Sequence, residues 1–326
     1  DANWSNQLGL DVASSGYAVL CFLGAGYDHR MPSAFKSTVK GGIDWLLSQQ
    51  ENDGVIGKGG RENYHHAIAA MALAEAYAMT NDPRLREPVQ KAVDIIIARQ
   101  NKDPEDGSPY GGLGWDYGRA TTRNDGSVAG WNVMALKSAA AAGIDVSPAM
   151  KGSDNYLERA WNAANPQGKT LDLYSGKSVF PYVWDTITND VVVRNTHGGG
   201  NRELACVGLV LAVFLGRKPG DAILETLSNF VMSEQLPTSW PPNTYYLYYN
   251  TLGIFQVGGK RWEKWNGTVR DLLVNHQRKS NDCFDGSWDW QGTQFSGHIY
   301  GRIFSTAYCC LSLEVYYRYM PIEAKK

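Results

Sequence analysis

The sequence has few cysteines and no pattern that would pair them. Five cysteines occupy positions 21, 206, 283, 309 and 310 of a chain of 326 residues. Their odd number and scattered spacing argue against a disulfide framework and against a cysteine-rich zinc site. A free cysteine packs as a small apolar side chain. We therefore expect these residues to be structural, and we expect neither a bound metal nor a cofactor.

Long apolar runs and blocks of positive charge are also missing. The apolar run VGLVLAVFLG at 207–216 is well short of the roughly 18 residues that a transmembrane helix needs. The formal net charge is −2, and the isoelectric point is about 6.3. Nucleic acids and anionic membranes bind clustered positive charge. We therefore expect no nucleic-acid partner and no transmembrane segment.

Strand signals are weak, and helical periodicity dominates the chain. Predicted helices of one kind are rich in alanine or apolar nearly all round, and they lie at 14–27, 62–80, 127–143, 201–216, 244–258 and 301–319. Predicted helices of a second kind carry one apolar and one charged face, and they lie at 31–50, 83–100, 147–164, 221–235 and 260–277. The two kinds alternate along the chain.

This alternation predicts two concentric layers of helices. A helix that is apolar all round is surrounded by other helices, whereas an amphipathic helix lies at the surface. Repeated inner and outer helices bury their faces against their neighbours and form a ring or a solenoid. We predict an all-α protein, an α/α toroid of about six helix pairs, as a single domain over 1–326.

The first ten residues, DANWSNQLGL, read as the tail of a turn that leads into a helix. This suggests that an upstream segment has been removed, which favours export from the cell. The unpaired cysteines favour the opposite, because reducing compartments keep thiols free. The sequence therefore leaves the compartment open.

A recurring turn follows the outer helices. Gln50, Gln100 and Gln277 each end a predicted outer helix, and a polar turn containing glycine follows each of them. After the second and third turns comes a tryptophan, Trp115 or Trp288. Glycine permits the positive φ of a tight turn, and a glutamine amide can bond backbone groups that a helix end leaves unpaired. We expect each tryptophan to seal the junction between the rings.

This Gln…Gly-x-Trp pattern resembles the QW repeat of the terpenoid cyclase and protein prenyltransferase superfamily. The segments GGIDWLLSQQ, SVAGWNVMALKSA and STAYCCLSLEVYYRY are similar to bacterial prenyltransferase and squalene oxidase repeat proteins of the kind found in planctomycetes. The resemblance implies an α/α toroid. For the cyclases of the superfamily it also implies an isoprenoid substrate inside the ring.

The catalytic motifs of that superfamily are only partly present. Its class II cyclases carry a D-x-D-D-T-A motif at the start of an inner helix. The matching stretch here, RNDGSVAGW, offers Asp125 as the general acid but lacks the flanking acids. The zinc-binding D-x-C pair of the prenyltransferases is absent from the matching stretch NTYYLYYNTLGIF. An aspartate just before a helix is also an ordinary N-cap, so both roles for Asp125 stay open.

Other polar candidates gather at the predicted starts of inner helices, which converge on one end of a ring. The candidate cavity or ligand-binding residues are Tyr64, His65, His197, Arg202, Glu203, Tyr245, Tyr249, His298 and Arg302. Convergent polar and aromatic groups around a cavity are typical of a binding or catalytic site. The charges of Arg202 and Arg302 oppose the helix dipole. We therefore expect a carboxylate or an anionic ligand beside each.

Four tyrosines lie in the segment TYYLYYN at 244–250. On a helix Tyr245 and Tyr249 share one face, while Tyr246 and Asn250 share another. One pair then lines the cavity while the other packs outward, or all the tyrosines pack between the two rings. The sequence leaves both arrangements open.

Three functions fit these residues. The first is a toroid without catalysis that binds an apolar or isoprenoid small molecule, or a protein partner; it predicts a cavity plugged by side chains. The second is a cyclase-like enzyme with Asp125 as general acid, which requires a closed aromatic chamber. The third is a toroid enzyme acting on polysaccharide, which predicts an open groove with exposed aromatic rings. The incomplete motifs favour the first.

Overall fold

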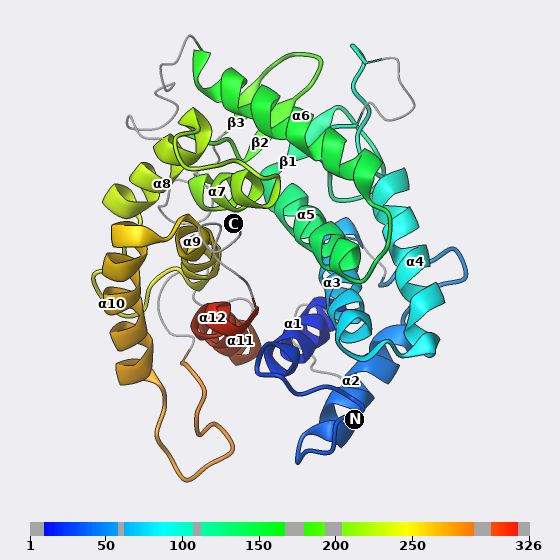
Figure 1. Ribbon diagram of the computed structural model, residues 1–326, viewed down its shortest axis with the longest axis vertical. Helices are drawn as coiled ribbons and strands as arrows, with labels where there is room; N and C mark the ends of the chain where they lie inside the picture. Colours follow the sequence, from blue (N-terminus) through cyan, green and yellow to red (C-terminus); the bar gives the residue numbers. More distant parts are fainter. Residues whose placement is uncertain are drawn as a thin grey trace.

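The computed structural model describes residues 10–57, 62–106, 112–166, 179–192, 204–289 and 301–318, and its helices form two concentric rings (Figure 1). The inner helices are α1 (Asp11–Gly24), α3 (Glu62–Thr80), α5 (Gly126–Ala141), α7 (Ala205–Phe214), α9 (Thr244–Val257) and α11 (Gly301–Leu313). The outer helices are α2 (Lys36–Ser48), α4 (Pro83–Ala98), α6 (Ser147–Ala164), α8 (Ala222–Glu234) and α10 (Gly259–His276). A short helix, α12 (Val315–Arg318), follows α11.

The inner ring closes on itself. Each inner helix packs on the next, from α1 through α3, α5, α7 and α9 to α11, and α11 packs back on α1. Neighbouring inner helices contact each other through their first halves. For example, Gly16 of α1 faces Ile68 of α3. Likewise Gly130 of α5 faces Val207 of α7 and Tyr249 of α9. The inner helices therefore run parallel and begin at one face, called the mouth below. The predicted α/α toroid is confirmed.

The burial of each helix follows its composition. All 10 residues of α7 are buried, because this apolar helix has neighbours on every side. By contrast, α4 buries only one stripe at three- and four-residue steps, made of Leu85, Val89, Ala92, Val93 and Ile96. Among the described helices, none combines the length and apolar character needed to cross a bilayer.

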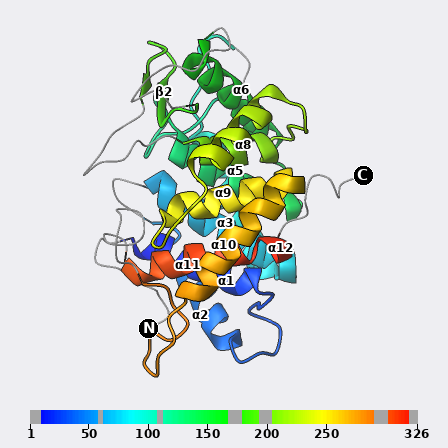
Figure 2. The same cartoon turned by 90° about the vertical axis from the view of Figure 1, so that its left-hand side faces the viewer.

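A small antiparallel sheet lies at the mouth and was not expected from the sequence. Its strands, in the order β1–β2–β3, are β1 (Arg123–Asp125), β2 (Val183–Asp185) and β3 (Val191–Val192). Asn124 pairs with Trp184 in the first ladder, and β1 continues directly into α5. Figure 2 shows β2 on the side at which α11 begins, opposite α12. The sheet therefore joins the segment that leads into α5 to the β2–β3 hairpin at the mouth.

The glutamines that end the outer helices tie neighbouring outer helices together. Nε2 of Gln50 donates to the carbonyl oxygen of Pro88 in α4 at 3.0 Å. Nε2 of Gln100 donates to the carbonyl oxygen of Leu113 at 2.7 Å and to that of Ala149 in α6 at 2.9 Å. These amides therefore bond carbonyl groups of the turn and of the neighbouring outer helix, instead of the groups that the ends of their own helices leave unpaired.

The tryptophans of these turns seal the junction between the rings, as predicted. Nε1 of Trp115 donates to the carbonyl oxygen of Ile96 at 2.8 Å, and Nε1 of Trp288 donates to that of Leu273 at 2.9 Å. Both indoles are buried. Each therefore satisfies a carbonyl group in the last turns of the preceding outer helix while its ring fills the junction.

His66, on inner helix α3, stabilises the fold and is not part of the mouth. Its Nδ1 accepts a hydrogen bond from the Ile56 amide at 2.9 Å, so Nε2 carries the proton and donates to the Ala92 carbonyl oxygen at 2.8 Å. Burial lowers the pKa of His66 to about 4. The neutral ring therefore links the turn after α2 to outer helix α4.

Replacing Gln100 with leucine should lower the free energy of unfolding by about 2–3 kcal/mol, because two buried hydrogen bonds are lost together. Gln277→Leu is the matched control. Gln277 is exposed and donates to the Gly286 carbonyl oxygen at 2.8 Å, where water can take its place, so its loss should cost under about 1 kcal/mol. Urea denaturation measures both values, and equal losses would contradict the role assigned to the buried amide.

Candidate functional site

Aromatic rings from four inner helices fill the axis of the ring. Tyr17 of α1 packs edge-on against Trp131 of α5, with ring centroids 5.1 Å apart. The hydroxyl oxygens of Tyr17 and Tyr308 of α11 lie 2.9 Å apart. Trp131 also stacks on Tyr248 of α9 at 6.0 Å and meets Tyr249 edge-on at 5.4 Å. All five side chains are buried; together they are called the aromatic plug below.

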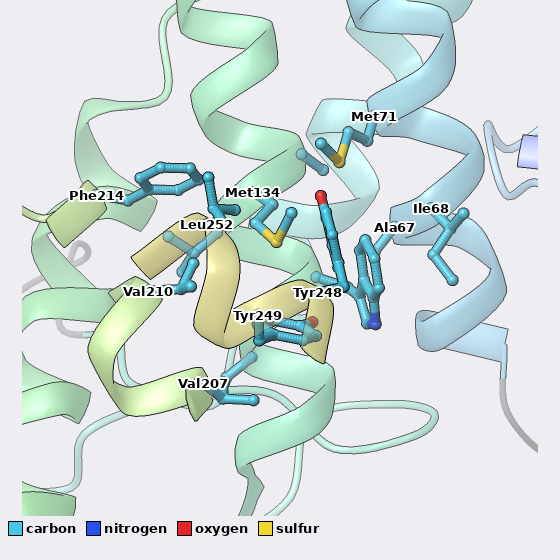
Figure 3. Packing of buried hydrophobic residues seen from close by; sticks show 14 of the residues in the cluster. Ala67, Ile68, Met71, Met134, Val207, Val210, Phe214, Tyr248, Tyr249 and Leu252 are labelled. Carbon is cyan, nitrogen blue, oxygen red and sulfur yellow. The ribbon is translucent and has the colours of Figure 1, made fainter. Parts of the chain in front are cut away.

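The plug decides between the two arrangements predicted for the tyrosines of α9. Tyr245 and Tyr249 point inward, with ring centroids 4.8 Å apart, whereas Asn250 points outward and donates to Oε1 of Gln235 at 2.9 Å. Figure 3 shows Tyr248 and Tyr249 reaching from α9 toward α3 and α5. One face of α9 therefore lines the axis and the other meets the outer ring. Side chains occupy the space in which a cyclase would fold an isoprenoid.

Nearer the mouth, two carboxylates share one arginine. Arg123 of β1 donates through Nη2 to Oδ2 of Asp125 at 2.9 Å, and through Nη1 to Oδ1 of Asp116. The Asp125 side chain is 0% exposed and that of Asp116 is 16% exposed. The guanidinium therefore joins a buried carboxylate to one that solvent can reach.

Asp125 is the N-cap of α5. Its Oδ1 accepts hydrogen bonds from the Ser127 amide at 3.0 Å, the Ser127 hydroxyl at 2.6 Å and the Val128 amide at 3.2 Å. Burial raises the pKa of Asp125, and the bonds from Ser127, Arg123 and Val128 offset only part of that rise. The capping role considered for Asp125 is confirmed. As the general acid of an isoprenoid cyclase Asp125 loses its basis, because the aromatic plug fills the chamber that such a substrate would need.

Two tyrosines complete this group. The hydroxyl oxygens of Tyr117 and Tyr182 lie 2.7 Å apart, and the Arg123 guanidinium lies 5.6 Å and 5.9 Å from their ring centroids. Those distances allow cation–π attraction to both rings. Burial raises the pKa of each phenol, and the nearby Asp125 raises it further. Asp116, Tyr117, Arg123, Asp125 and Tyr182 are called the mouth cluster below.

Several residues predicted for the site lie at the mouth, although not in one group. Tyr64 of α3 is partly exposed and meets Trp131 edge-on at 6.3 Å, so its ring lies between the plug and the mouth. His65 is buried near the start of α3. The remaining predicted residues that lie outside the described part of the chain are His197, Arg202, Glu203 and His298.

Arg302 forms an ion pair with a carboxylate, as predicted from its positive charge at the start of a helix. Its Nη1 lies 2.6 Å from Oδ1 of Asp289, and its guanidinium lies 4.5 Å from the ring centroid of Phe284. The partner is thus a residue of the turn after α10.

Sequence reasoning missed Asp116, Tyr117 and Tyr182. They lie in loops, where neither helical nor strand periodicity marks them, and contacts distant in sequence bring them to α5. Nδ2 of Asn63 on α3, for example, donates to the Asp116 carbonyl oxygen at 2.7 Å. The available signal was the spacing of Asp116, Arg123 and Asp125 within one polar turn.

No protein-family model and no curated protein sequence matches this chain. Solved structures match its fold. An inactive variant of the α-1,6-mannanase GH76A of Salegentibacter sp. HEL1_6, in complex with an α-1,6-mannotetraose, has a TM-score of 0.63 at 9% identity and covers 97% of this chain and 91% of that one. An unsaturated glucuronyl hydrolase specific for heparin has a TM-score of 0.64 at 14% identity over 94% and 85%.

A third match is the cellobiose 2-epimerase of Spirochaeta thermophila DSM 6192, with a TM-score of 0.61 at 11% identity over 93% of this chain and 86% of that one. These neighbours are toroids that process sugars. The resemblance to terpenoid cyclases and prenyltransferases is therefore wrong, and the isoprenoid ligand that it implied loses its support. The Gln and Trp turns satisfy helix ends in this ring by general chemistry, so they do not identify one family.

Replacing Arg123 with methionine should cost about 3 kcal/mol of folding stability at pH 7, because the buried Asp125 carboxylate loses its counter-charge. The pKa of Asp125, already raised by burial, should then rise further. A raised carboxyl pKa disfavours the folded state above the unfolded pKa. The cost should therefore shrink as the pH falls from 7 to 4.5 and the carboxyl binds a proton.

Arg217→Met is the control for this experiment. Arg217 pairs with Asp154 at 2.7 Å and Glu158 at 2.9 Å, whose side chains are 45% and 53% exposed. Water can solvate both carboxylates, so the loss should stay below about 1 kcal/mol. Chemical denaturation at the two pH values compares the variants. A cost for Arg123→Met that does not change with pH would contradict the link to Asp125.

Proposed function

We propose that this protein is an enzyme that acts on a polysaccharide or oligosaccharide bound at the mouth of the toroid. The observation that carries the proposal is the mouth cluster, in which Asp116 and Asp125 share Arg123 beneath two tyrosines. The sugar-processing activities of the neighbouring toroids support the same substrate class.

The chemistry of the cluster suits a sugar. Saccharides present many hydroxyl groups, which carboxylates, guanidinium groups and phenols bind through hydrogen bonds. Tyr64 and Tyr117 are both partly exposed and offer ring faces beside these polar groups. Because the aromatic plug fills the axis, the substrate is expected to lie across the mouth instead of entering the ring.

The mouth cluster contains two carboxyl groups, which is the pair that glycosidic bond cleavage commonly uses. In such reactions one carboxyl group donates a proton to the leaving oxygen, and the other acts on the sugar or on a water molecule. Asp125 is the candidate proton donor, because burial raises its pKa. Asp116 reaches solvent beside Arg123 and is the candidate second carboxylate. Arg123 holds the two groups in fixed relation.

A second candidate function is saccharide binding without turnover. It is favoured by the hydrogen bonds of Asp125, whose two carboxyl oxygens are both engaged by the helix end and by Arg123. In that case the cluster stabilises the structure of the mouth, and the sugar binds without proton transfer.

The test uses a panel of mannans, α- and β-linked glucans and uronate-containing glycans, with release of reducing ends as the measurement. Turnover by the wild-type protein is expected on at least one of them. Asp125→Asn and Asp116→Asn should each lower that rate by about 100-fold or more, because each removes one acid–base group. Asparagine caps helices as well as aspartate does, so the Asp125 variant should keep its fold.

Asp221→Asn is the matched control. Asp221 caps outer helix α8 through the Ile223 and Leu224 amides and lies 3.7 Å from Nη1 of Arg217, so it has the same kind of partners far from the mouth cluster. It should keep full activity. Binding that calorimetry detects without turnover would favour the second candidate, whereas a panel that shows neither binding nor turnover would overturn the proposal.

A further inference from the structure

The seam of the inner ring joins two helices from opposite ends of the chain. α1 and α11 lie side by side (Figure 1), and their contacts follow one register. Tyr17 meets Tyr308, and further along the two helices Gly24 meets the side chain of Glu314. No peptide segment links α1 to α11 directly, so side-chain packing holds this seam together.

Cys21 lies between these two contacts and faces α11. Its Sγ is 3.6 Å from the Ala307 carbonyl oxygen. Cys310 follows Ala307 by three residues and so shares its face of the helix. The neighbouring Cys310 thiol, and then burial, raise the pKa of the Cys21 thiol. Both cysteines are unpaired and partly exposed, so two thiols are in contact where a small reagent can reach them.

We propose that Cys21 and Cys310 are a modification site: on exposure to a low-molecular-weight disulfide such as oxidised glutathione they form a disulfide that closes the inner ring covalently. One protein thiolate attacks a sulfur of the reagent, forms a mixed disulfide and releases the first reagent thiolate. The second cysteine then attacks the protein sulfur of that mixed disulfide and displaces the other reagent thiolate. Two protein thiols are oxidised, one reagent disulfide is reduced to two thiols, and the two protons end on the released thiolates.

A neighbouring carboxyl group suits this exchange. Glu314 lies one turn after Cys310 on the same side of the seam, where it meets Gly24. Burial raises the pKa of Glu314 to about 7, and the Glu314 carboxylate in turn raises the pKa of the Cys21 thiol, while Arg318 lowers it. A group that gains and loses a proton near neutral pH can accept the proton of an attacking thiol.

The other three cysteines differ in setting. Cys206 and Cys309 are buried, and Cys309 follows a different face of α11 from Cys310 because adjacent helical residues diverge. Cys283 is exposed in the turn after α10. It should therefore form a mixed disulfide with the reagent, and Cys283→Ser removes this side reaction.

The experiment treats the folded Cys283→Ser protein with oxidised glutathione and measures its intact mass and its non-reducing peptide map. The mass should fall by two hydrogens, with a single cross-linked peptide pair containing Cys21 and Cys310. Adding Cys310→Ser should replace the cross-link by one glutathione adduct at Cys21, whereas adding Cys309→Ser should leave the cross-link in place. Because the bond closes a loop of nearly the whole chain, the unfolding temperature should rise by several degrees and return when the bond is reduced.

The wild-type protein, treated in the same way, should give the same cross-link and one adduct at Cys283, so the result does not depend on any variant folding. A protein that keeps both thiols, carries only glutathione adducts at Cys21 and Cys310, or pairs Cys309 with Cys310 would overturn the proposal.

Discussion

The closure of the inner ring is the constraint on which the rest of the structure depends. Helices α7 and α9 are buried nearly all round, so they cannot lie at the surface without exposing apolar area. Each must be enclosed by two inner neighbours and by the outer ring. The contact of α1 with α11 supplies the last neighbour, and the hydroxyl pair of Tyr17 and Tyr308 marks it at the axis. An outer helix carries the chain back between successive inner helices, so the inner helices run parallel and share a common mouth.

Closure of the ring also limits where charged side chains can lie. The aromatic plug fills the axis with interlocking rings, whose packing contributes both buried area and favourable edge-to-face geometry. Charged groups cannot lie among those rings without large desolvation costs. They collect instead at the first turn of α5, where backbone amides and Arg123 stabilise the Asp125 carboxylate.

The sequence was sufficient for the helices and their layers, because composition and periodicity report directly on burial. The turns were readable because glutamine, glycine and tryptophan recur after the outer helices, although the partners of Gln100, such as Ala149 in the next outer helix, were not. The sequence left the inward and outward faces of α9 open, because contacts with other helices decide between them. The successful predictions concern short-range order.

The rest depended on contacts that no local pattern encodes. The sheet uses strands of two or three residues, too short for alternation to show, and the loops that it joins are distant in sequence. Asp116 and Tyr182 reach Asp125 only through that sheet and through Asn63. The family assignment failed for a different reason. Glutamine and tryptophan at helix ends answer a need shared by rings of this kind, so the motif indicates an architecture more reliably than an ancestry.

The central claim is that a closed and plugged ring confines ligands to the mouth. The most direct measurement is a crystal structure of the protein soaked with the oligosaccharides of the substrate panel. The account predicts a sugar against Tyr117, Arg123 and Tyr182, with the rings of Trp131 and Tyr248 still stacked below it. A sugar seated between those two rings, or bound only on the outer helices, would contradict it.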